Sequence, residues 1–207
     1  EAYAAFYKAV WSAAWQDSGY FALAQIASSQ GAYDEALELV ESSLNRNVRH
    51  YRARHLKAAL LRKLGRCAEA AAFAEETLRL DVADFGARNE LALALAAQGD
   101  HARAGQVLEE LHRLMRGDEH NYLNLAADYA FCGLFDEAIG LLEWIAPEHP
   151  APTGSPSQAT ASAADGAPTR GVQQPNLMPM VHYALAYLYE RSDRTGQAEQ
   201  QRQLARQ

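Results

Sequence analysis

The densest group of chemically capable side chains is a basic run between Arg46 and Arg66. Within it every charged residue is an arginine or a lysine, and two histidines accompany them: Arg46, Arg49, His50, Arg52, Arg54, His55, Lys57, Arg62, Lys63 and Arg66. Guanidinium and ammonium groups bind carboxylates and other anions strongly. The run therefore predicts a surface that attracts an acidic partner. The alternative is an ordinary solvated surface whose charges are balanced by glutamates on adjacent helices: Glu38, Glu41, Glu75 and Glu76.

The other reactive residue types do not assemble into a catalytic pattern. The histidines show no metal-binding spacing: His50, His55, His101, His112, His120, His149 and His182. The sequence holds no nucleophile elbow and no glycine-rich phosphate loop. Cys67 and Cys132 lack a CxxC spacing, so they indicate neither a zinc site nor a disulfide framework. We expect a non-catalytic protein without cofactor or metal, and the two thiols favour a reducing, cytoplasmic location.

Composition narrows the class of partner. Apolar residues make up 49% and charged residues 22% of the 207 residues, which is typical of a folded globular chain. The net charge of −7 argues against a general nucleic-acid binder, because phosphate binding requires a clustered basic surface. The apolar residues are dispersed, so we expect no membrane segment.

The elements that must position the basic run form a repeat. Gly31, Gly65, Gly99 and Gly133 are spaced 34 residues apart. Small residues recur with them, five residues after and seven residues before each glycine: Ala36, Ala70, Ala104 and Ala138, then Ala24, Ala58, Ala92 and Ala126. A glycine ends a helix readily, and alanines let two helices approach closely. The pattern predicts stacked helix pairs that bury their apolar stripes against neighbouring pairs.

Four hexapeptides make this repeat similar to a known family: GAYDEA at 31–36, GRCAEA at 65–70, GDHARA at 99–104 and GLFDEA at 133–138. They resemble the tetratricopeptide repeat, a 34-residue helix–turn–helix unit. The resemblance implies an all-α, TPR-type α-solenoid, a right-handed superhelix of antiparallel helix pairs with about eleven helices. The family's terminal proline remains only as Pro150, and Val48, Val82 and Arg116 stand in its place elsewhere.

The repeat also predicts the domain organisation. Residues 1–147 hold a half unit, cut from a longer parent, and four repeats at about 17–50, 51–84, 85–118 and 119–150. Residues 148–176 are rich in Pro, Ser, Ala and Gly and predict a disordered insertion. Residues 177–207 restart the pattern, so we expect a fifth repeat that packs on the same solenoid.

In this family the first helix of each pair lines a concave groove, and the resemblance therefore assigns the partner-binding residues. Among the basic residues it points Arg52, His55, Arg62 and Lys63 into the groove, and turns Arg54 and Lys57 toward neighbouring helices. It adds two polar and three aromatic groove residues: Asn89, Asn124, Phe131, Tyr183 and Tyr187. The alternative for the three aromatic residues is that they pack against each other or against the insertion. The Lys, Asn and Arg set with which some family members clamp acidic chaperone tails is not reproduced.

These observations predict a protein–protein interaction module that binds a peptide or partner domain, acidic if the basic run faces it. A second hypothesis comes from three phrases, YKAVWSAAW, ARHLKAALLRKLGR and DFGARNELALA. They look similar to the helical region of large bacterial proteins with an upstream β-rich domain resembling carbohydrate-active modules. The chain would then be an accessory region of a glycan-processing or carbohydrate-binding protein, docking that domain. A third hypothesis is self-association through exposed solenoid ends, where aromatic residues crowd the first two helices.

Overall fold

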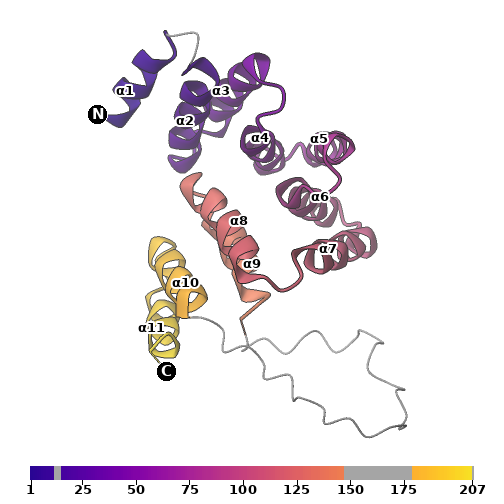
Figure 1. Ribbon diagram of the computed structural model, residues 1–207, viewed down its shortest axis with the longest axis vertical. Helices are drawn as coiled ribbons and strands as arrows, with labels where there is room; N and C mark the ends of the chain where they lie inside the picture. Colours follow the sequence, from indigo (N-terminus) through magenta and orange to yellow (C-terminus); the bar gives the residue numbers. More distant parts are fainter. Residues whose placement is uncertain (12–14, 147–178, 207) are drawn as a thin grey trace, which may run out of the picture. The chain divides into compact units, whose positions relative to one another are not determined.

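The computed structural model describes residues 1–11, 15–146 and 179–206, and in them all regular secondary structure is helical. Eleven helices follow one another through these residues, as the sequence predicts (Figure 1). Their bounds are α1 Ala2–Ala9, α2 Gln16–Ser29, α3 Tyr33–Arg46, α4 Tyr51–Lys63, α5 Cys67–Leu80, α6 Phe85–Ala97, α7 His101–Met115, α8 Glu119–Phe131, α9 Phe135–Glu143, α10 Pro179–Arg191 and α11 Thr195–Leu204. The expected insertion at 148–176 lies outside the described residues.

The chain divides into two compact units, Glu1–Ala138 and Ile139–Gln207, which we call the N-terminal unit and the C-terminal unit. The N-terminal unit contains α1 to α8 and the start of α9. The C-terminal unit contains the end of α9 with the pair α10 and α11. Among the described residues no helix is both long and apolar enough to cross a bilayer.

The four repeated glycines end the first helix of each pair in the N-terminal unit. Each has a positive φ, between 74° and 87°. The residue after each glycine donates its N–H to the carbonyl five residues earlier, for example Ala32 to Ala27 at 3.0 Å and Asp100 to Leu95 at 3.0 Å. This is the Schellman arrangement, which closes a helix and reverses the chain. The glycine spacing therefore fixes where each pair turns.

The recurring alanines form the packed interior between the helices of the N-terminal unit. Their side chains are almost fully buried, from 0% exposed at Ala36 to 5% at Ala104. Larger residues fill the spaces beside them, among them Leu23, Leu60 and Leu111. Because the alanines hold the helix axes close, the polar residues of each first helix project from a rigid frame.

Two buried arginines bind the backbone at the joints between pairs, at the two valines that stand where the family usually has proline. Arg54 donates to the carbonyl of Val48 at 3.3 Å and forms an ion pair with Glu76 at 2.7 Å. Arg88, 34 residues later, donates in the same way to the carbonyl of Val82, and it contacts Glu110 at 2.7 Å. Both arginines are at most 5% exposed. The joint carbonyls are thus satisfied by a side chain from the following helix.

The first helix, α1, buries none of its own residues. It is followed by Val10, which is 7% exposed and fits against Gly19 of α2. Large aromatic side chains on and after α1 are exposed to solvent: Tyr3, Phe6, Tyr7, Trp11 and Trp15. This end of the N-terminal unit therefore presents an aromatic surface.

The C-terminal unit is built around one antiparallel pair. Val181, Leu185 and Leu188 on α10 are buried. His182 Nδ1 lies 2.7 Å from Gln201 Oε1 of α11 in the buried interface. Tyr189 donates to the carboxylate of Glu143 at the end of α9. One face of α10 is thereby fixed, and its opposite face remains on the surface.

Candidate interaction surface

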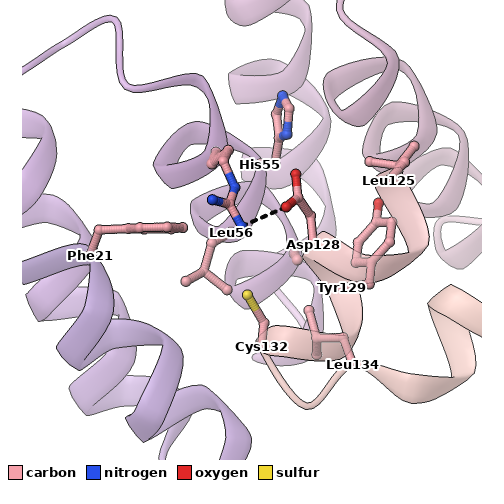
Figure 2. A pocket seen from close by; sticks show the side chains of 10 residues that line it. Phe21, His55, Leu56, Leu125, Asp128, Tyr129, Cys132 and Leu134 are labelled. Carbon is pink, nitrogen blue, oxygen red and sulfur yellow. Dashed lines mark ion pairs between the residues drawn. The ribbon is translucent and has the colours of Figure 1, made fainter. Parts of the chain in front are cut away.

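Side chains of α2, α4 and α8 converge on one side of the N-terminal unit, which we call the inner face. They enclose a small cavity lined by Phe21, Arg52, His55, Leu56, Ala59, Leu125, Asp128, Tyr129, Cys132 and Leu134 (Figure 2). Its volume is about 20 Å³, which is enough for about one water molecule. A small-molecule site needs roughly 300 Å³ or more. This cavity is therefore too small to hold a small-molecule ligand.

Arg52 lies at the edge of this cavity and pairs with Asp128 of α8. The two side chains are 2.6 Å apart, and they are 48% and 34% exposed. The Arg52 guanidinium also lies 5.6 Å from the centre of the Phe21 ring, within the range of a cation–π contact. This ion pair joins the second helix pair to the fourth.

His55 is held at the start of α6. Its Nε2 lies 2.6 Å from Asp84 Oδ1, but the angles are not those of a hydrogen bond, and both ring nitrogens lack a hydrogen-bond partner. Asp84 accepts the N–H of Ala87 at 2.7 Å and so caps α6. A Cβ on Gly86 would come within 2.2 Å of the imidazole. We regard the contact as electrostatic and steric, and His55 as part of the packing.

Arg62 and Lys63 enter a buried polar network. Arg62 pairs with Glu90 at 3.0 Å and with Glu137 at 3.0 Å, and Lys63 reaches Glu137 at 2.6 Å. Glu90 is completely buried and also accepts a hydrogen bond from Tyr129 at 2.8 Å. All four of the basic residues assigned to the groove thus face carboxylates of this same chain.

The pKa values follow from this network. Burial, reinforced by the charge of Glu90, raises the pKa of Tyr129 well above its usual value of 10. Burial alone would also raise the pKa of Glu137. The hydrogen bond from Lys63 and the charge of Arg62 outweigh it, so that pKa lies below its usual value of 4.5. Glu137 is therefore ionised at neutral pH. Its Oε1 contacts both Arg62 and Lys63, whereas its buried Oε2 has no hydrogen-bond partner among the described residues.

The remaining predicted residues have different environments. Asn89 is 5% exposed and donates to the Tyr129 hydroxyl at 2.8 Å, so it stabilises the network from inside. Asn124 and Phe131 are exposed on α8, Phe131 at 67%. Tyr183 and Tyr187 are exposed on α10 of the C-terminal unit, at 47% and 55%. The structure thus brings Arg52, Asn124 and Phe131 to accessible positions on the N-terminal unit.

The prediction that Arg54 and Lys57 turn toward neighbouring helices is confirmed. Lys57 pairs with Glu41 at 2.8 Å. The Arg54 guanidinium and the Lys57 ammonium group also lie over the ring of Phe73, 4.5 Å and 5.0 Å from its centre. Glu41 and Glu76 are two of the four balancing carboxylates that the sequence suggested.

The sequence did not reveal the acids that face the groove cations: Asp84, Glu90, Asp128 and Glu137. One signal was present. Glu90 occupies the repeat position held by Leu56 and Asn124 in the neighbouring pairs, and a carboxylate in a partly apolar position requires a partner. Within the described residues no cluster of His, Cys, Asp or Glu is arranged as a metal site.

Comparison with known proteins bears on the fold. Residues 86–110, which cover most of α6 and α7, match the family model of the tetratricopeptide repeat. None of the curated proteins matches this chain.

Several solved structures are similar over most of their length. TTC0263, a thermophilic TPR protein of Thermus thermophilus, shares 21% identity at a TM-score of 0.49, over 89% of this chain and 87% of its own. YrrB, described as a TPR protein with an unusual peptide-binding site, shares 17% sequence identity at a TM-score of 0.48, and the match covers 97% of this chain and 90% of YrrB. MamA of Desulfovibrio magneticus shares 16% sequence identity at a TM-score of 0.47, and the match covers 91% of this chain and 92% of the MamA chain. The repeated helix pairs and the match over residues 86–110 together support an all-α fold of the tetratricopeptide type.

Proposed function

We propose that this chain is a non-catalytic protein–protein interaction module, and that the inner face of the N-terminal unit binds a peptide or a partner domain. The observation that carries the proposal is a line of accessible side chains along α8. His120, Asn124, Ala127 and Phe131 are all exposed, at spacings of three and four residues that place them on one side of the helix. Asp128, with its partner Arg52, lies beside this line.

The chemistry of this line suits a polypeptide. Phe131 supplies an apolar anchor, since its ring is 67% exposed, and aromatic residues contribute strongly to binding energy. The Asn124 amide can both donate to and accept from a peptide backbone. Because the adjoining cavity holds only about 20 Å³, affinity must come from contacts spread over the surface.

The exposed arginines near the inner face favour an acidic partner over a basic one. Arg46 and Arg49 are exposed at the corner between α3 and α4. Arg52 follows them near the start of α4 and is half-exposed. Three guanidinium groups on one corner and the adjoining helix turn would accelerate the approach of an acidic segment and fix its orientation.

The test is capture of partners from a lysate of the source organism. The immobilised wild-type chain is compared with the variant Arg52→Gln/Phe131→Ala. The matched control is Arg103→Gln/Leu80→Ala, which removes an exposed arginine and an exposed apolar residue from second helices. A protein retained by the wild type and the control, but lost with the inner-face variant, supports the proposal. Retention by all three proteins would place binding elsewhere.

A second candidate function rests on the aromatic surface of α1. The rings of Tyr3 and Tyr7 stack with centres 6.5 Å apart, and Tyr7 meets Trp11 edge-on at 6.4 Å. These residues, with Ala4 and Lys8, line an open hollow of about 400 Å³. Such a surface suits docking against a second copy, or against a neighbouring domain in a glycan-processing or carbohydrate-binding parent protein.

Light scattering over a concentration series separates these two uses of α1. Self-association predicts a rising mass for the wild type and a constant monomer mass for Tyr7→Ala/Trp11→Ala. A wild-type chain that remains monomeric at high concentration would rule out self-association. Domain docking would then be tested by adding the candidate β-rich domain as a separate protein and measuring complex formation.

A further inference from the structure

One ion pair of the inner face differs from its neighbours in exposure. In the Arg62–Glu90 and Arg62–Glu137 contacts the arginine is 12% exposed and the carboxylates 0% and 6%. Lys63 is 26% exposed, but its partner is the same buried Glu137. Arg52 and Asp128 are exposed at 48% and 34%. Among the inner-face pairs in the described residues, only Arg52–Asp128 lets water or a ligand reach both groups.

This accessible pair spans the inner face. Arg52 belongs to α4 and Asp128 to α8, so the bond connects helix pairs that are not neighbours in the repeat. The apolar side chains of Leu56 and Leu125 line the small cavity together with this pair (Figure 2). Asp128 therefore covers the cation that a visiting carboxylate would meet first.

We propose that Asp128 is an internal competitor for the partner's carboxylate on Arg52, and that an acidic peptide binds the inner face by displacing it. The proposal rests on the interaction function proposed above and names the chemistry of its partner. The exchange replaces one carboxylate by another on the same guanidinium, so the charge balance of Arg52 is preserved. Specificity for an acidic peptide arises because only a carboxylate can compensate Arg52 once Asp128 has left.

The surroundings of the pair favour an acidic ligand over a basic one. Arg46 and Arg49 are exposed and have no ion pair within the described part of the chain. Phe131 follows Asp128 by three residues, so its exposed ring lies about one helix turn away. A peptide carboxylate on Arg52 would place a nearby apolar side chain of the same peptide against that ring.

The exchange is feasible because the internal pair is weak. An exposed ion pair contributes a factor of about two to five to an equilibrium constant, and salt reduces it. A multivalent acidic peptide that contacts Arg52 and the neighbouring arginines can exceed that factor. Arg62, by contrast, is held by two buried carboxylates and is not available for exchange.

The test measures binding of fluorescein-labelled deca-glutamate by fluorescence anisotropy at low ionic strength. Asp128→Asn should bind the peptide about two- to fivefold more tightly than the wild type, because the competitor is gone. The matched control is Glu75→Gln, which frees Arg103 from a comparable pair at 2.5 Å with exposures of 53% and 37%. Both substitutions change the net charge equally, and the control should leave the affinity unchanged within error.

The double variant Arg52→Gln/Asp128→Asn should lose the gain, since no guanidinium remains to be released. Asp128→Ala provides a second release variant, and circular dichroism verifies that each protein is folded. The proposal is overturned if Asp128→Asn binds no more tightly than Glu75→Gln, if the gain persists without Arg52, or if neither the wild type nor Asp128→Asn binds deca-glutamate.

These outcomes are distinct from failure of the interaction function. If a lysate partner is lost with Arg52→Gln/Phe131→Ala while Asp128→Asn leaves deca-glutamate affinity unchanged, the inner face is an interaction surface and the displacement mechanism is wrong. If capture is indifferent to the inner-face variant, the interaction function itself fails there.

Discussion

Replacement of Glu90 by glutamine tests the role of the buried network most directly. The Glu90 carboxylate is completely buried. It accepts hydrogen bonds from Arg62 Nε at 3.0 Å, from Arg62 Nη2 at 3.3 Å and from the Tyr129 hydroxyl at 2.8 Å. Glutamine has nearly the same shape, so the variant removes the charge and one acceptor with little change in packing.

The magnitude follows from what remains unpaired. At the place of Oε1 the glutamine oxygen can keep the Tyr129 hydroxyl and Arg62 Nη2 as donors, but its amide group then faces the Arg62 Nε–H that Oε2 accepted. Arg62, only 12% exposed, is then left with Glu137, which it shares with Lys63. Removing one member of a buried ion pair costs about 3–5 kcal/mol, and retention of Glu137 lowers this to about 2–4 kcal/mol. In a chain of this size that corresponds to a fall in Tm of roughly 5–15 °C.

The assay is thermal unfolding followed by far-UV circular dichroism, with Glu75→Gln as the matched control. Glu75 is exposed and pairs with Arg103, so its replacement should lower the stability by at most about 1 kcal/mol. Tyr129→Phe should lower the stability by about 1–2 kcal/mol, because the buried Asn89 amide loses its acceptor. A Glu90→Gln midpoint within about 2 °C of the Glu75→Gln midpoint would refute the assignment of this network as a stabilising element.

Three further changes probe the frame of the N-terminal unit. Gly133→Ala should destabilise the chain in urea more than Gly99→Ala by about 1–3 kcal/mol, because only at Gly133 would the new Cβ meet backbone, 2.6 Å from Ser29 Cα. Burial lowers the pKa of His112 from 6.5 to about 4, so the folded state binds fewer protons than the unfolded state between these pH values. In urea titrations His112 should therefore contribute a stability loss of about 1–2 kcal/mol, after discounting for partial exposure, as the pH falls from about 6.5 to 4. His112→Gln should remove this contribution and leave the loss due to His50, whose pKa is also lowered by burial. Arg88→Ala should lower the stability by about 2–4 kcal/mol in thermal melts, because it leaves the Val82 carbonyl without its donor. The control is Arg113→Ala, at a side chain that is 76% exposed, and it should change the stability by less than about 0.5 kcal/mol.

The helical frame could be predicted from the sequence because its determinants are local. A glycine at the end of a helix, and an alanine at each close contact, recur at a fixed spacing, and each acts within one helix pair. For the same reason, the orientation of Arg54 and Lys57 toward adjacent helices could be predicted from the repeat. Their partners Glu76 and Glu41 belong to the same pair or the preceding one.

The pairing across the inner face could not be predicted in this way. Arg52 and Arg62 belong to the second helix pair, whereas Asp128 and Glu137 belong to the fourth. A repeat pattern specifies which side of a helix faces inward, but the distance between non-neighbouring pairs depends on small rotations that accumulate along the stack. The sequence therefore predicted a basic inner face, and it missed the carboxylates that lie opposite.

These cross-stack contacts alter how the N-terminal unit can respond to a partner. In an ordinary solenoid each repeat contacts only its neighbours, so the groove can flex at little energetic cost. Here the Ser28 hydroxyl of the first pair also donates to the Cys132 carbonyl beside the fourth, at 2.8 Å in a buried position. Together with the Arg62–Glu137 bond, this contact couples distant pairs, and opening the face would expose buried polar groups that need new partners. The exposed Arg52–Asp128 pair has no such penalty, because water can solvate both groups once they separate. On the interaction function proposed above, a partner is therefore expected to act at this edge and to leave the buried network intact. The accessible edge, more than the whole set of basic residues, should then determine what the inner face recognises.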